Sequence, residues 1–272
     1  MNKNITASLL LVTIALFSKI NQANATFQNF SSRNHIKKEG YNWQIKHPNC
    51  HKILSSSQVD NSTAYAELLS KYVSSTGKVN YAGIKKNEAK LNQAIEYFKE
   101  NTPQSNWSNS KKLAYWINAY NLFTIKLVID NFPVSSIKNI ANGKPWDKKF
   151  IQLDGKTMSL NDIENGIIRK QFNEPRIHFA VNCASVSCPK LANEEYTSTN
   201  LNTLLDKQAK RYINDHNENS LTGKTIQISS IFDWYQGDFV DGVIPFLNKF
   251  SNSKIRSDVK ITYKEYNWSL NN

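Results

Sequence analysis

The chain has 272 residues, of which 40% are hydrophobic and 11% aromatic, and its formal net charge is +12. A chain of this length and apolar content can bury a core of its own, which excludes a disulfide-stapled mini-protein and a wholly disordered chain. Its mean hydropathy of -0.54 excludes a protein that crosses a membrane many times.

Residues 1–25 have the pattern of a secretory signal peptide. Lys3 supplies a positive start, an apolar run extends from Ile5 to Phe17, and Ala23-Asn24-Ala25 forms a cleavage motif. A membrane anchor is the alternative, but the run is shorter than the ~20 apolar residues that a spanning helix needs. We therefore expect an exported protein, periplasmic or secreted, with no integral membrane span after the signal peptide is cleaved.

The positive charge indicates which charged partners an exported protein would meet. Anionic polymers of the cell envelope are within its reach, whereas nucleic acid is not an expected partner. The lysines are spread along the chain, with pairs at 37–38, 85–86, 111–112 and 148–149. This spread favours a generally basic surface over a dedicated site for a polyanion.

The rest of the chain predicts one α+β domain. Residues 26–60 are polar and aperiodic, so we expect a loosely ordered arm there, followed by a single domain over 61–272. Helical periodicity predicts helices at 61–76, 83–100, 110–131, 159–172, 199–215 and 238–250. Strands are expected at 176–183, 225–229 and 260–266, with a hairpin at 150–158 that turns at Asp154-Gly155. Because the helix at 110–131 is apolar on nearly all sides, it should be a buried central helix packed on a small, mostly antiparallel sheet.

The segment 176–189 concentrates the residue types that carry chemistry. In an extended strand Arg176, His178 and Asn182 would share one face, while Cys183 would point to the other. Cys183 lies five positions after His178, so the two could pair only across a turn or bulge that follows Asn182.

The cysteines Cys50, Cys183 and Cys188 leave three alternatives open. Cys183 and Cys188 could form a structural disulfide, or be two buried thiols, if the intervening residues fold back tightly. Cys183 could instead be a reactive thiolate beside Arg176 or His178. A metal site could use Cys183, Cys188 and His178, with help from His47, Cys50 or His51. The spacing fits no structural zinc pattern, so we expect no metal and no cofactor.

Three further polar residues could complete a site. Glu164, on the helix after the hairpin, could orient His178, and Arg169 on the same helix could bind an anion. Asn118 and Asn121 lie on one face of the central helix. Their amides could tie loops to the core, or Asn118 could orient a ligand; a structural network is the alternative for all these polar groups.

Several motifs resemble the Domain of Unknown Function 547 family. They occur in order from about residue 63 to the C-terminus: Leu113 to Asn121, Ser136-Ile137, Ser159-Leu160, Asp162 to Glu164, Ile168-Arg169, Arg176 to Ser185, Cys188-Pro189, Phe232 to Tyr235, Asp238-Phe239, Tyr263 and Tyr266 to Asn271. The family's activity is unassigned, so the resemblance itself implies no reaction. A distant similarity to papain and transglutaminase folds would imply a helix cysteine facing a strand histidine, but here the central helix has no cysteine.

Two functional hypotheses follow from these residues. In the first, the protein is a hydrolase or transferase that acts on acyl or amide bonds. Cys183 or a bound water would be its nucleophile and His178 its general base, oriented by Glu164 or Asn118. Arg176, Arg169 and Asn118 are the candidate binding groups. In the second, the protein is a non-catalytic binding or scaffold domain of the envelope. In both cases the ligand would be a small molecule or a peptide.

Overall fold

The computed structural model describes residues 63–272, all of which belong to one compact unit. The predicted signal peptide, the predicted arm and Cys50 lie outside the described residues. No helix within 63–272 has both the length and the apolar character to cross a membrane.

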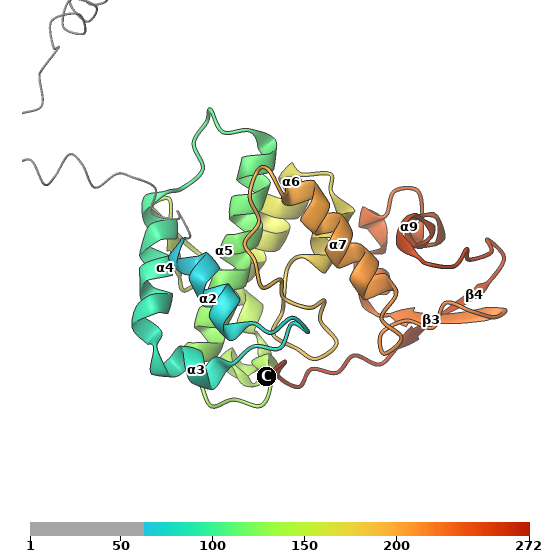
Figure 1. Ribbon diagram of the computed structural model, residues 1–272, viewed down its shortest axis with the longest axis horizontal. Helices are drawn as coiled ribbons and strands as arrows, with labels where there is room; N and C mark the ends of the chain where they lie inside the picture. The colour runs from blue at the N-terminus through green and yellow to red at the C-terminus, as the bar shows by residue number, and fades with distance from the viewer. Residues whose placement is uncertain (1–62) are drawn as a thin grey trace, which may run out of the picture. The chain divides into compact units, whose positions relative to one another are not determined.

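The central helix is α5, which spans Asn109–Asp130 and is buried on nearly every side. The Ser108 side chain caps its first turn by accepting a hydrogen bond from the Lys111 N–H. Helices α2 (Ala64–Tyr72), α3 (Tyr81–Lys86) and α4 (Glu88–Glu100) pack against one another, and α3 and α4 contact α5 (Figure 1). The single helix expected at 83–100 is thus two helices, because the backbone leaves the helical region at Asn87.

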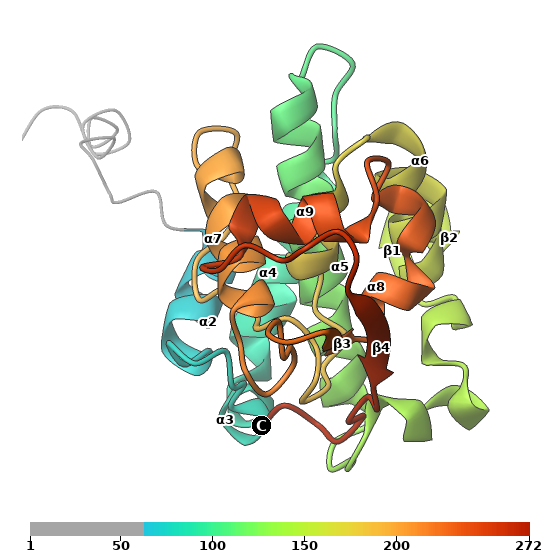
Figure 2. The ribbon, with the colours of Figure 1, turned by 90° about the vertical axis from the view of Figure 1, so that its right-hand side faces the viewer.

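A second hydrophobic core lies under the C-terminal third of the chain. It is built by α7 (Leu201–Ile213), β3 (Thr225–Ser229), α8 (Ile231–Trp234), α9 (Val243–Phe250) and β4 (Lys260–Lys264) (Figures 1 and 2). Phe179 packs in this core against Tyr212, Phe232 and Phe246, whereas Ile177 and Ala180 belong to the core around α5. The segment around His178 therefore connects the two cores.

The strands form two separate pairs within the described residues. Strands β1 (Ile151–Leu153) and β2 (Lys156–Met158) form the expected antiparallel hairpin. Strands β3 and β4 are parallel, with Thr225 opposite Lys260, so the expected mostly antiparallel sheet was wrong for this pair. Two strands that run the same way need a long crossover, which α8 and α9 provide here. The α+β class is confirmed.

The helix expected at 159–172 is present in an unusual form. Ser159 and Asp162 form the predicted reciprocal cap. The Asp162 N–H donates to the Ser159 hydroxyl oxygen, and the Ser159 N–H and hydroxyl donate to the Asp162 carboxylate. The next turns are a π-helix, Asp162–Ile168, which passes into the short helix α6 (Arg169–Gln171). π-helical turns often occur at functional sites, and this one carries Glu164.

The strand expected at 176–183 was wrong. Pro175–Phe179 is a 3₁₀ helix, with Pro175 in its first turn and the Glu174 side chain accepting from the Arg176 N–H. Proline suits a first helical turn because it has no N–H to donate. The strand-like alternation that would place Arg176 and His178 on one face is therefore absent.

Candidate functional site

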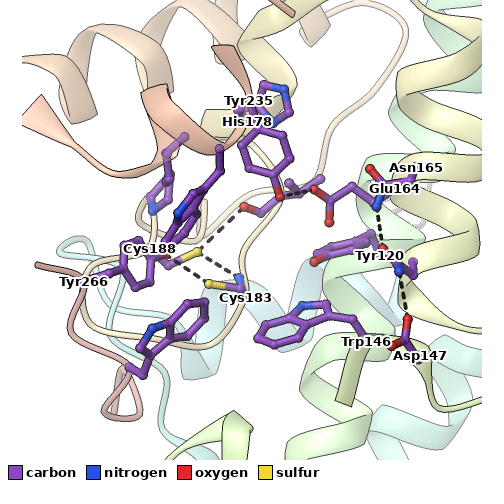
Figure 3. Close-up of a pocket in the computed structure, with 16 residues that line it drawn as sticks. Tyr120, Trp146, Asp147, Glu164, Asn165, His178, Cys183, Cys188, Tyr235 and Tyr266 are labelled. Carbon is purple, nitrogen blue, oxygen red and sulfur yellow. Dashed lines mark hydrogen bonds between the residues drawn. The ribbon is translucent and has the colours of Figure 1, made fainter. Parts of the chain in front are cut away.

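A cavity of about 290 Å³ lies beside the loop that carries Cys183 and Cys188 (Figure 3). Its size is near the lower end of the range of ligand pockets, ~300–1,000 Å³. Aromatic side chains make up much of its lining: Tyr120, Trp146, Trp234, Tyr235, Tyr266 and Trp268. The polar part of the lining includes Glu164, His178 and Cys183, so the structure brings together around one cavity the three side chains proposed as catalytic from the sequence.

Asn121 on α5 fixes the start of the cysteine loop. Its side-chain N–H donates to the Ala180 carbonyl at 2.9 Å, and its side-chain oxygen accepts from the Asn182 N–H at 2.7 Å. The Asn182 side chain continues the clamp, accepting from the Ala184 N–H and donating to the Pro189 carbonyl. The backbone of Ala184 has a φ of 61°, so the chain turns sharply directly after Cys183.

The C-terminal segment holds the other side of this loop. Backbone N–H groups of Val186 and Ser187 donate to the carbonyls of Ser269 and Asn267, and the Asn271 N–H donates to Ala184. The same segment places the Tyr266 hydroxyl against the Cys183 sulfur. The last family motif, Tyr266 to Asn271, thus builds one wall of the cavity.

Cys183 is partly exposed and is surrounded by hydrogen-bonding groups. Its sulfur lies 3.0 Å from the Ser185 hydroxyl and 3.2 Å from the Tyr266 hydroxyl. Burial alone would raise the pKa of the Cys183 thiol, but its interactions with Cys188, Ser185 and Tyr266 outweigh burial and lower it. These groups therefore favour the thiolate, which is the nucleophilic form of cysteine.

Cys188 has the opposite character. It is buried, and burial followed by the neighbouring Cys183 raises the pKa of its thiol. Its sulfur accepts a hydrogen bond from the Cys183 backbone N–H at 2.9 Å. Cys183 and Cys188 are free thiols in the described structure, and the disulfide between them stays a prediction.

Asp238 takes the place predicted for Glu164 as the partner of His178. His178 Nε2 lies 2.7 Å from the Asp238 carboxylate, which also receives two hydrogen bonds from the Arg169 guanidinium. The hydrogen bonds from His178 and then from Arg169 hold the pKa of Asp238 well below its usual range. Because the charged Asp238 oxygen accepts from Nε2, the other ring nitrogen of His178 is the one free to take a proton.

That second nitrogen, Nδ1 of His178, is buried and has no hydrogen-bond partner among the described residues. The ring is stacked on Tyr235 with the two centroids 3.9 Å apart. An unpartnered buried acceptor costs free energy unless a ligand or water satisfies it. No hydrogen bond joins His178 to Cys183 in the described structure, so the two are not paired directly.

Glu164 contacts Tyr235 instead of His178. The Tyr235 hydroxyl donates to the Glu164 carboxylate at 2.7 Å, and burial together with the charge of Glu164 raises the pKa of Tyr235. The expected contact between Glu164 and His178 does not form. Tyr235, whose ring stacks on His178, donates its hydroxyl to the Glu164 carboxylate instead. Glu164 is buried and lines the cavity.

All three predicted binding residues lie outside the lining. Arg176 is hydrogen-bonded to Glu174, Asp206 and the side chain of Asn202. Asn118 is hydrogen-bonded in both directions to the backbone of Tyr196. These two side chains tie segments of the fold together. Arg169 contacts the site from behind the lining, through Asp238, Asn165 and the Tyr235 ring.

Three contributors to the site have roles that the sequence did not indicate: Asp238, Tyr266 and Ser185. They belong to the recognised motifs, but nothing local predicts that Asp238 pairs with a histidine 60 positions earlier. No three His, Cys, Asp or Glu side chains of residues 63–272 gather closely enough to hold a metal ion.

Acid should weaken the fold through Asp238, and Asp238→Asn should remove part of this dependence. Because the folded-state pKa of Asp238 is lowered, its stabilisation is fully present above its ordinary pKa of ~4 and is lost as the pH falls through the folded value. Since the carboxylate is partly exposed, solvent screening limits this contribution to about 1 kcal/mol. Denaturant titrations of both proteins between neutral and acidic pH measure the difference. Equal pH dependence of the two unfolding free energies would contradict the assignment.

The α+β fold and the cavity define a domain in which two thiols, one histidine and one buried carboxylate surround an aromatic pocket. Residues 104–213 match the model of the family described as "Protein of unknown function, DUF547", which supports the resemblance that the motifs predicted. The match includes Glu164, His178 and Cys183, whereas Tyr235, Asp238 and Tyr266 follow it in the chain. No curated protein matches the chain, and no solved structure does either. The distant similarity to papain and transglutaminase folds stays a prediction.

Proposed function

We propose that this domain is a cysteine-dependent hydrolase or transferase that acts on acyl or amide bonds. The observation that carries the proposal is the environment of Cys183, whose sulfur borders the cavity and is held by two hydroxyl groups that favour the thiolate. A thiolate with such donors is a nucleophile ready to attack a carbonyl carbon.

The reaction divides between the two sides of the cavity. The cycle begins with a Cys183 thiolate and a His178 that is protonated at Nδ1. The thiolate attacks the carbonyl carbon, the bond to the leaving nitrogen or oxygen breaks, and the leaving group takes the Nδ1 proton as a thioester forms. Water, or an acceptor in a transfer reaction, then attacks the thioester and returns a proton to Nδ1, while the carbon–sulfur bond breaks and releases the Cys183 thiolate. Asp238 stabilises the imidazolium that results, and Arg169 holds Asp238 in place.

The alternative is a non-catalytic binding domain of the envelope, and one observation favours it. Cys183 and His178 are not hydrogen-bonded to each other among the described residues. Tyr235 occupies both other groups, because its ring stacks on His178 and its hydroxyl donates to Glu164. The export predicted from residues 1–25 forms part of both proposals. Anionic envelope polymers remain the charged partners that we propose.

A chromogenic acyl ester such as p-nitrophenyl acetate tests the catalytic proposal. We expect a burst of one equivalent of p-nitrophenol per protein and an acetyl group on Cys183, found by mass spectrometry of peptides. Cys183→Ala should abolish both. Cys188→Ser is the matched control, because its hydroxyl can still accept from the Cys183 N–H, and it should retain the burst. A burst of the same size from Cys183→Ala would rule out Cys183 as the nucleophile, and the absence of any burst from the unaltered protein would make the binding domain the better description.

A further inference from the structure

The lining of the cavity has an unusual charge for this protein. The chain is strongly basic, yet the described residues that line the cavity include the carboxylates of Glu164 and Asp147 and no lysine or arginine. The Asp147 carboxylate already accepts a hydrogen bond from the Asn161 side chain. In Figure 3, Asp147 lies below Asn165 on one side of the cavity. The charged groups that face a ligand are therefore both carboxylates, and of the two only Glu164 is buried.

Glu164 is in no ion pair of residues 63–272, and Arg169, whose pKa its charge helps to raise, is itself hydrogen-bonded to Asp238. Glu164 is 4% exposed, and its one hydrogen-bond donor among the described residues is the uncharged Tyr235 hydroxyl. Burying a carboxylate without a counter-charge is costly, so a ligand that brings a positive charge would gain from this position.

The aromatic rings of the lining favour the same kind of ligand. Ring faces attract cations, and six rings surround the cavity: Tyr120, Trp146, Trp234, Tyr235, Tyr266 and Trp268. Two of them already contact a cation of the protein, with Arg169 5.0 Å from the Tyr235 centroid and Lys138 5.1 Å from that of Trp268. Within the described residues, no lysine or arginine lies over the face of any of the other four rings, so no cation of the protein competes with one of the ligand for these faces.

The unpartnered Nδ1 of His178 adds a second, independent requirement. This atom needs a hydrogen-bond donor, as does a carboxylate such as Glu164. A protonated primary amine carries one positive charge and three N–H donors, whereas an alcohol lacks the charge and a quaternary ammonium ion lacks the donors.

We infer that the cavity selects ligands that carry a protonated primary amine, which binds between Glu164 and the aromatic rings. This preference rests on the proposed function in one respect: the ligand is a substrate only if Cys183 is a catalytic nucleophile. In that case the acyl or amide compound attacked by Cys183 carries such an amine close to the reacting bond.

Three small probes of equal chain length test the inference: n-butylamine, n-butanol and butyrate. The titrations use the full protein with Cys183→Ser, so that binding is measured without any reaction, and the tryptophans of the lining report binding by fluorescence. We expect saturable binding of butylammonium, roughly tenfold or more weaker binding of butanol, and no binding of butyrate, because a hydrogen-bonded charge contributes about that much.

Glu164→Gln should abolish the preference for the amine over the alcohol. Glu195→Gln is the matched control, because Glu195 also accepts from a hydroxyl, that of Thr63, but does not line the cavity. Equal affinity for the amine and the alcohol, or no saturable binding of the amine up to millimolar concentrations, would overturn the inference. The probe experiment omits the nucleophile, so the two proposals can fail separately. No amine binding together with a normal acetyl burst would leave the catalytic proposal standing. Amine binding without an acetyl burst would leave only the binding site.

Discussion

Asn121→Ala should lower the free energy of unfolding by about 3 kcal/mol and should also slow the alkylation of Cys183. The substitution leaves the Ala180 carbonyl and the Asn182 N–H without partners in the core, and each such buried group costs ~1–3 kcal/mol. It also frees the loop that positions Cys183, so the hydroxyl groups around the sulfur should no longer be held in place. Denaturant unfolding and the rate of iodoacetamide labelling measure the two effects.

Asn118→Ala is the control for this experiment. Asn118 lies one helical turn before Asn121 on α5, is also buried, and also makes two hydrogen bonds to backbone groups, but those belong to Tyr196. We expect a comparable loss of stability with an unchanged rate of Cys183 alkylation. If both variants slow the alkylation equally, Asn121 has no special role in placing the thiol.

Tyr266→Phe should raise the pKa of the Cys183 thiol. The lost hydroxyl lies 3.2 Å from the sulfur and can donate to the thiolate, and removing a donor from a charged acceptor costs ~1.5–3 kcal/mol. The thiolate of Cys183 should therefore form only at higher pH in the variant. The alkylation rate, which follows the thiolate, should shift to higher pH.

Tyr263→Phe provides the comparison for this variant. Tyr263 lies three residues earlier on β4 and is partly exposed, away from the cavity lining. Its loss should leave the alkylation profile of Cys183 where it is. A profile of Tyr266→Phe that coincides with that of Tyr263→Phe would show that the Tyr266 hydroxyl does not stabilise the thiolate.

The elements with strong local signals could be predicted from the sequence. The apolar residues of α5, the Asp154-Gly155 turn and the cap formed by Ser159 and Asp162 each depend on neighbours a few positions away. Apolar residues and turn formers of this kind determine local structure almost independently of the rest of the fold.

The segment around His178 could not be predicted in the same way. Alternating apolar residues there resemble a strand, but Pro175, the Glu174 cap and the packing of Phe179 into the second core favour a 3₁₀ helix. This difference moves Arg176 away from the cavity and leaves His178 inside it. Tertiary contacts commonly override local preference in short segments.

The partners within the site come from distant parts of the chain. Asp238 lies 60 positions after His178, and Tyr266 lies 83 positions after Cys183. The sequence gives no local sign of such pairing and favours Glu164, the nearer acid, as the partner of His178. The identity of the three central residues could be proposed from residue type, whereas the contacts between them required the fold.

The proposed function depends on surroundings that favour the thiolate of Cys183 beside the cavity. The most direct test is the pH dependence of iodoacetamide labelling of Cys183 and Cys188, measured separately by peptide mass spectrometry on the intact protein. The account predicts that Cys183 is labelled faster and that its profile has a midpoint below the ~8.5 of an ordinary thiol, while Cys188 reacts slowly up to higher pH. A midpoint for Cys183 at or above that of an ordinary thiol, or faster labelling of Cys188, would contradict it.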